Sequence, residues 1–234
     1  MALYILRNGD VVPSLAARRG QYPDWIAAPI RESWGDEIVV VDPREGLPPG
    51  LLEADAVILS GSPSSVTEEA PWMLQLEEAL RGLLARGTPV LGICFGHQLI
   101  AKAMGGEVQR NPRGREIGTV EVQRLADDPL FAGLPPCFAA NATHMDTITR
   151  LPEGARLLAT SALDQIAAYA LGSARCVQFH PEMDGDILRS LMEVRRPILE
   201  AEGFAVDEMI ARTVDTTSGP TILQNFIRSL HRQG

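Results

Sequence analysis

The sequence is poor in the features that mark disulfide frameworks, zinc sites, nucleic-acid binding and membrane spans. Three cysteines occur in 234 residues, an odd number without a Cys-x-x-Cys pair, and this pattern argues against a disulfide framework or a zinc site. The formal net charge of -9 leaves no basic surface for nucleic acid or an anionic membrane. No apolar run approaches the roughly 20 residues of a membrane span. We therefore expect a small polar substrate, a reducing compartment, no metal or cofactor, and neither nucleic acid nor membrane as a partner.

The length and the hydrophobic content of the chain fit one domain. At 45% hydrophobic residues, a chain of 234 residues can bury one full core. Its opening residues, MALYILRNGD, lack the basic region and long apolar core of a secretory signal. We expect a single domain over residues 1–234 in the cytoplasm, and the composition leaves the oligomeric state open.

Short apolar runs recur along the chain, with helix-like stretches between them. Four early runs predict strands, several of them apolar on consecutive positions: residues 2–7, 36–42, 54–61 and 88–94. Shorter runs later in the chain predict further strands, some antiparallel: residues 118–125, 137–144, 155–162, 164–172 and 174–180. The alternation predicts an α/β fold around a mostly parallel central sheet.

Helical spacing is clearest over residues 71–87, where Pro71 suits the first turn and Gly87 the C-cap. After residue 180 the pattern becomes helical again, over residues 186–203, 206–214 and 221–233. The segment around 184–218 is longer than the short link to a final helix that a minimal domain needs. This helical extension either caps the active site, forms an interface, or packs on the sheet as an extra surface helix.

The cysteine at position 94 sits where a predicted strand gives way to a predicted helix. Gly92-Ile93-Cys94-Phe95-Gly96 has the form G-x-nucleophile-x-G, in which glycines let a side chain occupy a strained strand-to-helix turn. The helix that follows, from about residue 96 to 104, aims its N-terminal N–H groups at the sulfur and favours the thiolate. The alternative is that Cys94 is a small buried hydrophobe.

A thiol nucleophile needs a base, and that base needs a third group to orient it. His180 and Glu182, in ARCVQFHPEMDGD, supply such a pair at the end of another strand-like run. A parallel sheet brings the carboxyl ends of its strands to one edge, so His180 is expected to lie over the same edge as Cys94. The alternative is a surface histidine and glutamate that follow a strand.

Three stretches together resemble the class I, triad-type glutamine amidotransferases, and their motifs are most similar to the amidotransferase domain of GMP synthetase. They are the nucleophile elbow at 92–98, the Val-Gln-Phe-His-Pro-Glu motif at 177–182, and the oxyanion strand and loop at 58–63. Their order and separation also match the family. The resemblance implies a flavodoxin-like three-layer α/β sandwich.

The resemblance also implies a mechanism. Cys94 attacks the γ-carboxamide of glutamine, His180 protonates the departing ammonia and later activates water, and Glu182 orients His180. The oxyanion of the tetrahedral intermediate is expected to bind the backbone N–H groups of Phe95 and Ser62. Glycine is usual in the family where this sequence has Ser62, so the loop must accommodate a Cβ atom there.

Further substrate contacts follow from the resemblance. Gly61 lies in the oxyanion loop, and Gln98 matches a position that contacts glutamine. Arg115, Glu116, Ile117 and Gly118 resemble a loop that embraces the amino-acid end of the substrate, although a charged β-turn explains these four residues equally well. Residues 143–146 resemble a Ser-His-Gly-Asp segment near the site, where we expect His144 to have a supporting or structural role.

Family members of this type usually deliver ammonia to a synthetase domain or subunit. This sequence contains neither a P-loop nor an S-G-G-x-D loop, so acceptor chemistry that uses ATP is expected on a synthetase partner. Two alternatives stay open. One is a γ-glutamyl peptidase or hydrolase that applies the same triad to a larger γ-glutamyl compound. The other is a docking module without catalysis, which would have no use for an intact triad.

Overall fold

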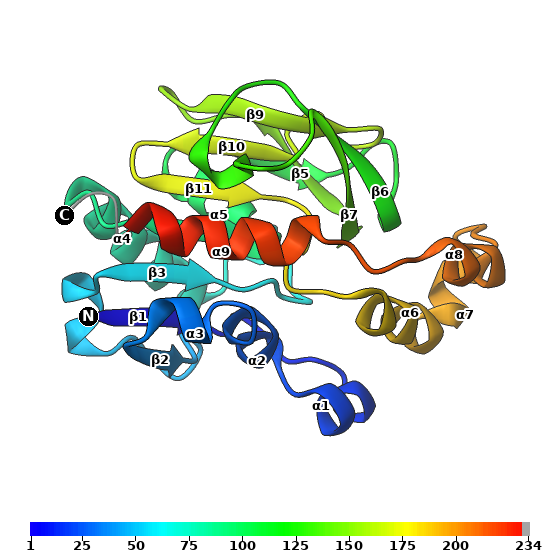
Figure 1. Ribbon diagram of the computed structural model, residues 1–234, viewed down its shortest axis with the longest axis horizontal. Coiled ribbons are helices and arrows are strands. Elements are labelled where there is room, and N and C mark those ends of the chain that lie inside the picture. Colours follow the sequence, from blue (N-terminus) through cyan, green and yellow to red (C-terminus); the bar gives the residue numbers. More distant parts are fainter. Residues whose placement is uncertain (231–234) are drawn as a thin grey trace.

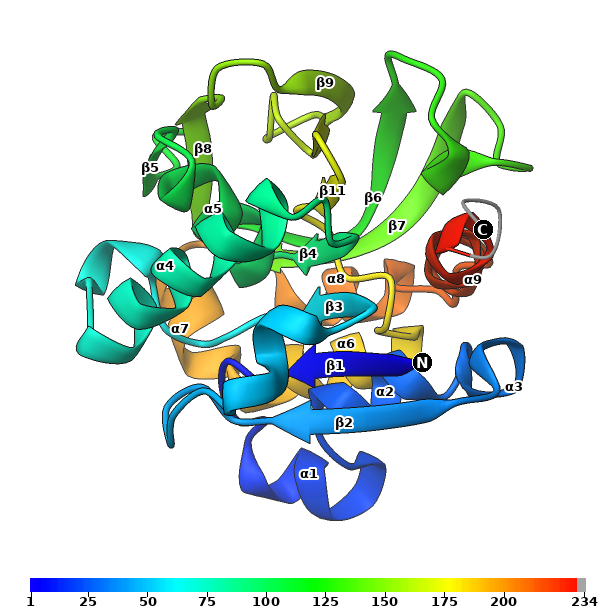
Figure 2. The same cartoon turned by 90° about the vertical axis from the view of Figure 1, so that its left-hand side faces the viewer.

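The computed structural model describes residues 1–230, and a nine-stranded sheet forms its centre (Figure 1). The strands lie in the order β2-β1-β3-β4-β11-β10-β9-β6-β7. The strand bounds are β1 (Ala2–Leu6), β2 (Glu37–Val41), β3 (Ala56–Leu59), β4 (Val90–Ile93), β5 (Glu107–Arg110), β6 (Glu116–Arg124), β7 (Cys137–His144), β8 (Asp146–Arg150), β9 (Arg156–Ser161), β10 (Ala168–Leu171) and β11 (Ala174–Val177). β5 and β8 form a separate antiparallel pair, which Figure 2 shows beside α5.

Five neighbouring strands, from β2 to β11, run parallel to one another. β3 and β4 are buried along their whole length, which explains their unbroken apolar sequence. From β11 to β7 the sheet continues in antiparallel pairs. The predicted α/β fold with a mostly parallel central sheet is confirmed, and the expected antiparallel strands extend it.

Helices cover both faces of the sheet. The helices of the described residues are α1 (Pro13–Arg19), α2 (Tyr22–Ala27), α3 (Arg31–Trp34), α4 (Pro71–Ala85), α5 (Phe95–Ala103), α6 (Gly185–Val194), α7 (Arg196–Ala201), α8 (Val206–Arg212) and α9 (Ser218–Leu230). Leu76 of α4 and Leu99 of α5 pack into the core on one face, whereas Ile26 of α2 and Phe226 of α9 pack into the core on the other. In Figure 1, α9 lies in front of the strands and α4 and α5 lie behind them. The flavodoxin-like three-layer arrangement is therefore confirmed.

Helices α6, α7 and α8 lie beyond the end of the sheet toward which β3 points (Figure 1). An apolar cluster joins them to β6: Ile117, Leu188, Met192, Leu199 and Val206. The continuous helical pattern predicted over residues 186–203 is interrupted at Arg195, between α6 and α7. Pro197 explains the break, because proline lacks a backbone N–H and its ring clashes with the preceding turn of a helix.

Three short helices between residues 13 and 34 were not predicted, and neither were β5 and β8. Each of these helices has seven residues or fewer, and proline or glycine at positions 13, 20, 23, 29 and 35 suggests turns in this stretch. The final predicted helix begins at Ser218, three residues earlier than expected, and residues 231–233 of that prediction lie outside the described residues. The assignment of the whole chain to a single domain stays a prediction. Within residues 1–230, no helix combines the length and apolar character needed to cross a membrane.

The α6–α8 extension is expected to open independently of the sheet when its apolar cluster is weakened. Leu199 is fully buried in that cluster, so Leu199→Ala should destabilise the extension by about 2–5 kcal/mol. Amide hydrogen exchange, measured by mass spectrometry, should be faster in Leu199→Ala than in the wild type over residues 185–212 and should remain slow in β3 and β4. Val194→Ala is the matched control, because Val194 is 46% exposed on the same extension. Uniformly faster exchange throughout the chain would show that the extension unfolds only with the core.

Candidate active site

Cys94 lies at a sharp turn between β4 and α5. Its backbone has φ 50° and ψ -98°, and Glu69 is the only other non-glycine residue with positive φ among those that the structure describes. Such a conformation is unfavourable for a residue with a Cβ atom and marks functional sites. The N–H of Cys94 donates to the Val177 carbonyl, at 2.9 Å, and the N–H of Gln98 donates to the Cys94 carbonyl, at 3.1 Å. These bonds join the turn to β11 and to the first turn of α5.

The glycines on either side of Cys94 allow α5 to approach the sheet closely. A Cβ atom at Gly92 would lie 2.7 Å from Cδ1 of Ile100 and 2.8 Å from the carbonyl carbon of Gly96. A Cβ atom at Gly96 would lie 2.5 Å from Cβ of Leu59 in β3. Real Cβ atoms do not approach other carbon atoms this closely, so the turn requires glycine at both positions. The sequence frame of the predicted elbow therefore has a packing cause.

His180 and Glu182 follow β11 and lie next to Cys94. Nδ1 of His180 donates to Oε1 of Glu182, at 2.7 Å, and both residues are buried. Since Nδ1 is engaged, Nε2 is left for the hydrogen bond with the Cys94 thiol. A Cβ atom at Gly61 would lie 2.8 Å from Cε1 of His180 and 3.8 Å from Cβ of Cys94. The residues predicted as nucleophile, base and orienting group thus meet at the carboxyl edge of the parallel strands.

The charges around His180 favour its protonated form. Burial opposes the charge, but the carboxylate of Glu182 and the sulfur of Cys94 outweigh burial and raise the pKa of His180 to about 10. A protonated base beside a thiol is the partner that stabilises a thiolate. The same proton is then available to a leaving group.

The two predicted oxyanion donors come from different segments, Phe95 from α5 and Ser62 from the loop after β3. Phe95 is the first residue of α5, so its N–H has no acceptor within the helix. The Cβ atom of Ser62 causes no backbone strain, because its φ is not positive, and its Oγ accepts from the N–H of Ser64, at 3.1 Å. Gly9 provides the space, since a Cβ atom there would lie 2.8 Å from Oγ of Ser62. The oxyanion role of both residues stays a prediction.

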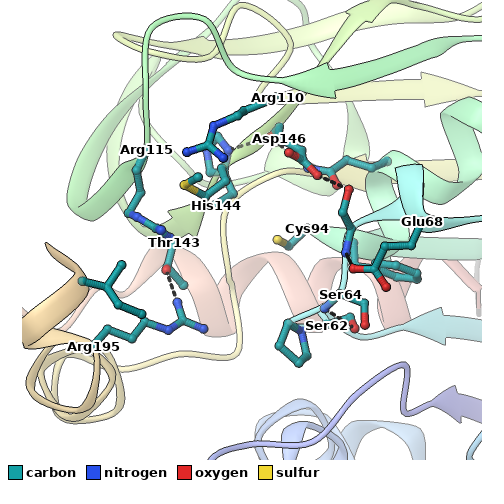
Figure 3. Close-up of a pocket in the computed structure, with 16 residues that line it drawn as sticks. Ser62, Ser64, Glu68, Cys94, Arg110, Arg115, Thr143, His144, Asp146 and Arg195 are labelled. Carbon is teal, nitrogen blue, oxygen red and sulfur yellow. Dashed lines mark hydrogen bonds between the residues drawn. The ribbon is translucent and has the colours of Figure 1, made fainter. Parts of the chain in front are cut away.

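A pocket of about 460 Å³ opens over Cys94 (Figure 3). Its lining combines the oxyanion loop, the start of α5, the β7–β8 turn and the α6–α7 junction: Ser62, Pro63, Ser64, Ser65, Glu68, Cys94, Phe95, Gln98, Arg110, Arg115, Thr143, His144, Met145, Asp146, Arg195 and Ile198. His180 and Glu182 are not among its lining residues. Glu182 instead reaches a second cavity, of about 360 Å³, together with Trp25 and Pro181.

Of the predicted substrate contacts, Gln98 and Arg115 line the pocket, whereas Gly61, Glu116, Ile117 and Gly118 do not. Arg115 donates to both carboxylate oxygens of Glu202, at 2.8 and 3.0 Å. Glu116 is buried and accepts from His144, and Ile117 packs against α6, α7 and α8. Gly118 has φ 126°, which explains a glycine there without a ligand. The geometry therefore gives no support to a direct substrate contact by the side chains of residues 116–118.

Sequence reasoning missed several pocket residues. Arg195 and Ile198 come from the helical extension. Capping of the active site was one of the three roles considered for this extension. The guanidinium of Arg195 donates to Oγ1 of Thr143, at 2.9 Å. Glu68 and Arg110 carried no motif. No local sequence pattern marks these two residues, because only the folded chain brings the loop after β3 and strand β5 to the pocket. In the described part of the chain, no group of three or more His, Cys, Asp or Glu side chains is arranged to hold a metal ion.

Known proteins resemble this chain in sequence and in fold. Residues 35–190 match the model of the family described as "Glutamine amidotransferase class-I". A GMP synthase (glutamine-hydrolysing) of Pyrobaculum aerophilum is 44% identical over 165 residues, which cover 70% of this chain and 31% of that protein. The chain thus spans about a third of the length of this relative.

One further relative and one solved structure match over more of their length. "Gamma-glutamyl peptidase 3" of Arabidopsis thaliana is 31% identical over 211 residues, covering 84% of this chain and 83% of that protein. A crystal structure of a glutamine amidotransferase from Thermotoga maritima superposes with a TM-score of 0.75 at 23% identity, covering 100% of this chain and 97% of that one. At this identity, the structure supports the fold.

A methyl group at position 61 should displace the His180 ring, because the added Cβ would lie 2.8 Å from Cε1. Displacing a catalytic group by about 1 Å can cost about 100-fold in rate. We expect Gly61→Ala to slow the alkylation of Cys94 by iodoacetamide at pH 7 by about tenfold or more, as measured by peptide mass spectrometry. Gly50→Ala is the control, since its nearest neighbour would be the Tyr4 hydroxyl at an ordinary 3.4 Å. Equal rates in the two variants would contradict the close contact.

The raised pKa of His180 predicts a pH-dependent stability. Burial lowers this pKa, Glu182 and Cys94 raise it, and the net value is about 10, against about 6.5 in an unfolded chain. Its contribution is therefore complete below about pH 6.5 and is lost as the pH rises toward about 10. Denaturant unfolding should show a steeper loss of stability across this window in the wild type than in His180→Gln. Parallel curves for the two proteins would refute a raised pKa.

Proposed function

The chain belongs to the class I glutamine amidotransferase family, and from this premise we propose that it hydrolyses the γ-carboxamide of glutamine through a thioester on Cys94. The products are glutamate and ammonia. The observation that carries the proposal is that Cys94, in its strained turn, meets the buried pair of His180 and Glu182 below a pocket of about 460 Å³. In that pair, Nδ1 of His180 lies 2.7 Å from Oε1 of Glu182.

In the first half of the reaction, the Cys94 thiolate attacks the γ-carbonyl carbon and a carbon–sulfur bond forms. The negative charge moves to the carbonyl oxygen, where the N–H groups of Phe95 and Ser62 stabilise it. His180 then donates its proton to the departing nitrogen. The carbon–nitrogen bond breaks, ammonia leaves, and a γ-glutamyl thioester remains.

In the second half, water attacks the thioester and His180, now neutral, takes the proton of that water. The carbon–sulfur bond breaks, glutamate leaves, and the sulfur departs as the thiolate. Glu182 accepts from Nδ1 of His180 throughout, which keeps Nε2 directed at the reacting atoms and stabilises the imidazolium.

Ammonia released here is proposed to serve a synthetase domain or subunit. The match to the GMP synthase covers 31% of that protein, and no ATP-binding P-loop occurs in this sequence. A cytoplasmic location would suit such a pair, and it remains a prediction from the sequence.

A second candidate is a γ-glutamyl peptidase with the same triad. Two observations favour it: the Arabidopsis relative of that name matches over 83% of its own length, and a pocket of about 460 Å³ falls in the size range of drug-sized ligands, which are larger than glutamine. The docking module is not proposed, since it leaves the buried His180–Glu182 pair without a purpose.

Brief exposure of the protein to glutamine should produce a γ-glutamyl adduct on Cys94, seen by intact-protein mass spectrometry, and glutamate should accumulate in the same tubes. Cys94→Ala should form no adduct and should lose at least about 1,000-fold in glutamate release. A panel of γ-glutamyl amides and peptides runs in parallel. Adducts with those compounds alone would favour the peptidase, and adducts with neither group would contradict both functions.

A further inference from the structure

A second buried histidine, His144, lies at the pocket with both ring nitrogens facing hydrogen-bond acceptors. Its Nε2 is 2.9 Å from Oε2 of Glu116, and its Nδ1 is 3.0 Å from the backbone carbonyl oxygen of Asp146. A carbonyl oxygen can only accept, so Nδ1 must carry a proton. Glu116 also acts as an acceptor, because its Oε1 receives hydrogen bonds from the Ser161 hydroxyl and the Leu163 N–H.

Two donors at Oε1 favour the ionised carboxylate of Glu116, and beside an ionised Glu116 both ring nitrogens of His144 are donors, which makes the ring an imidazolium. Burial opposes this charge, but Glu116, Cys94 and Asp164 outweigh burial and raise the pKa of His144. The pKa of Glu116 is lowered, because the donors around its carboxylate outweigh burial. The groups that face the ring are Glu116, Asp164, Cys94 and His97, and His97 is neutral, since burial and the charge of His144 lower its pKa to about 3.

The Asp146 carbonyl connects His144 to the predicted substrate contact on α5. Nε2 of Gln98 donates to this carbonyl, at 3.0 Å, and to Oε1 of Gln178, at 2.9 Å. Both acceptors require the NH₂ end of the Gln98 amide to point toward them, so its Oε1 points the other way. Oε1 of Gln98 makes no hydrogen bond within the described residues and is not among the buried unpaired atoms. It is an acceptor that remains open to the pocket.

We propose that His144 is a positioning residue: held as an imidazolium by Glu116, it fixes the Asp146 carbonyl and thereby turns Oε1 of Gln98 toward the substrate. An acceptor in this orientation selects a substrate N–H donor, either the γ-carboxamide or the α-ammonium group. The proposal deepens the glutaminase proposed above and rests on it for its kinetic consequence. The fixed charge of His144 is distinct from the proton that His180 transfers.

The protonation state can be tested without activity, by NMR of protein with ¹⁵N-labelled histidine. The chain has four histidines, and loss of one signal set in His144→Asn assigns His144. We expect both of its ring nitrogens to be protonated at pH 7. Glu116→Gln should convert the ring to the neutral form protonated at Nδ1, because the amide then donates to Nε2. A neutral His144 in the wild type, or an unchanged charge in Glu116→Gln, would overturn the proposal.

Two substitutions separate the two hydrogen bonds of His144. In His144→Asn, the side-chain amide reaches the position of Nδ1 and can still donate to the Asp146 carbonyl. In His144→Gln, the amide reaches the position of Nε2 and keeps only the bond to Glu116. We expect KM for glutamine to rise about tenfold or more in His144→Gln and about threefold or less in His144→Asn, with smaller changes in kcat. Equal KM values, or the reverse order, would indicate a merely structural role.

A double-mutant cycle tests the path through Gln98. If His144 acts by orienting Gln98, His144→Gln should have little further effect on KM in a Gln98→Ala background. Independent, multiplying effects would refute this path. The side-chain amide signals of Gln98 add a readout that needs no turnover, since they should shift in His144→Gln and stay in place in His144→Asn. If wild-type protein forms no γ-glutamyl adduct, the glutaminase proposal fails, while the NMR comparisons still decide whether His144 positions Gln98.

Discussion

The close approach of α5 to the parallel strands is the constraint on which the site depends. Gly92 and Gly96 have no room for a Cβ atom against Ile100 and Leu59, so the chain must turn from β4 into α5 within one residue. That residue is Cys94, which takes a positive φ of 50°. The turn exposes the sulfur to the pocket and directs the free N–H groups of the first turn of α5 toward it. A longer or looser turn would allow neither.

Parallel pairing supplies the partners of Cys94. β3, β4 and β11 are neighbours in the sheet and run in the same direction, so the segments that follow them end at one edge. Gly61 comes after β3, Cys94 after β4, and His180 after β11. Because Gly61 has no side chain, the His180 ring can lie close to it: a Cβ atom at Gly61 would be only 2.8 Å from Cε1 of His180. Three segments far apart in sequence are therefore in contact because of strand order alone.

Two buried histidines near the sulfur differ in their hydrogen-bond partners. His180 has one nitrogen on Glu182 and leaves the other for Cys94, so its proton can move during a reaction. His144 has both nitrogens on acceptors that belong to the protein, so its protons are held in place. The first arrangement suits acid–base chemistry, and the second suits a fixed charge that orients its neighbours.

The sequence by itself determined the backbone plan and predicted the three residues that meet at the carboxyl edge of the parallel strands. Consecutive apolar positions identified β3 and β4, the glycine frame identified the turn at Cys94, and the residues after β11 identified His180 and Glu182, because each signal lies within a few neighbouring residues. Only the tertiary structure decided which side chains complete the pocket. Ser65 lies 81 residues before its partner Asp146, and Arg195 lies 52 residues after Thr143. Such polar contacts have no period and no local spacing, since they depend on how strands and helices pack once the chain has folded.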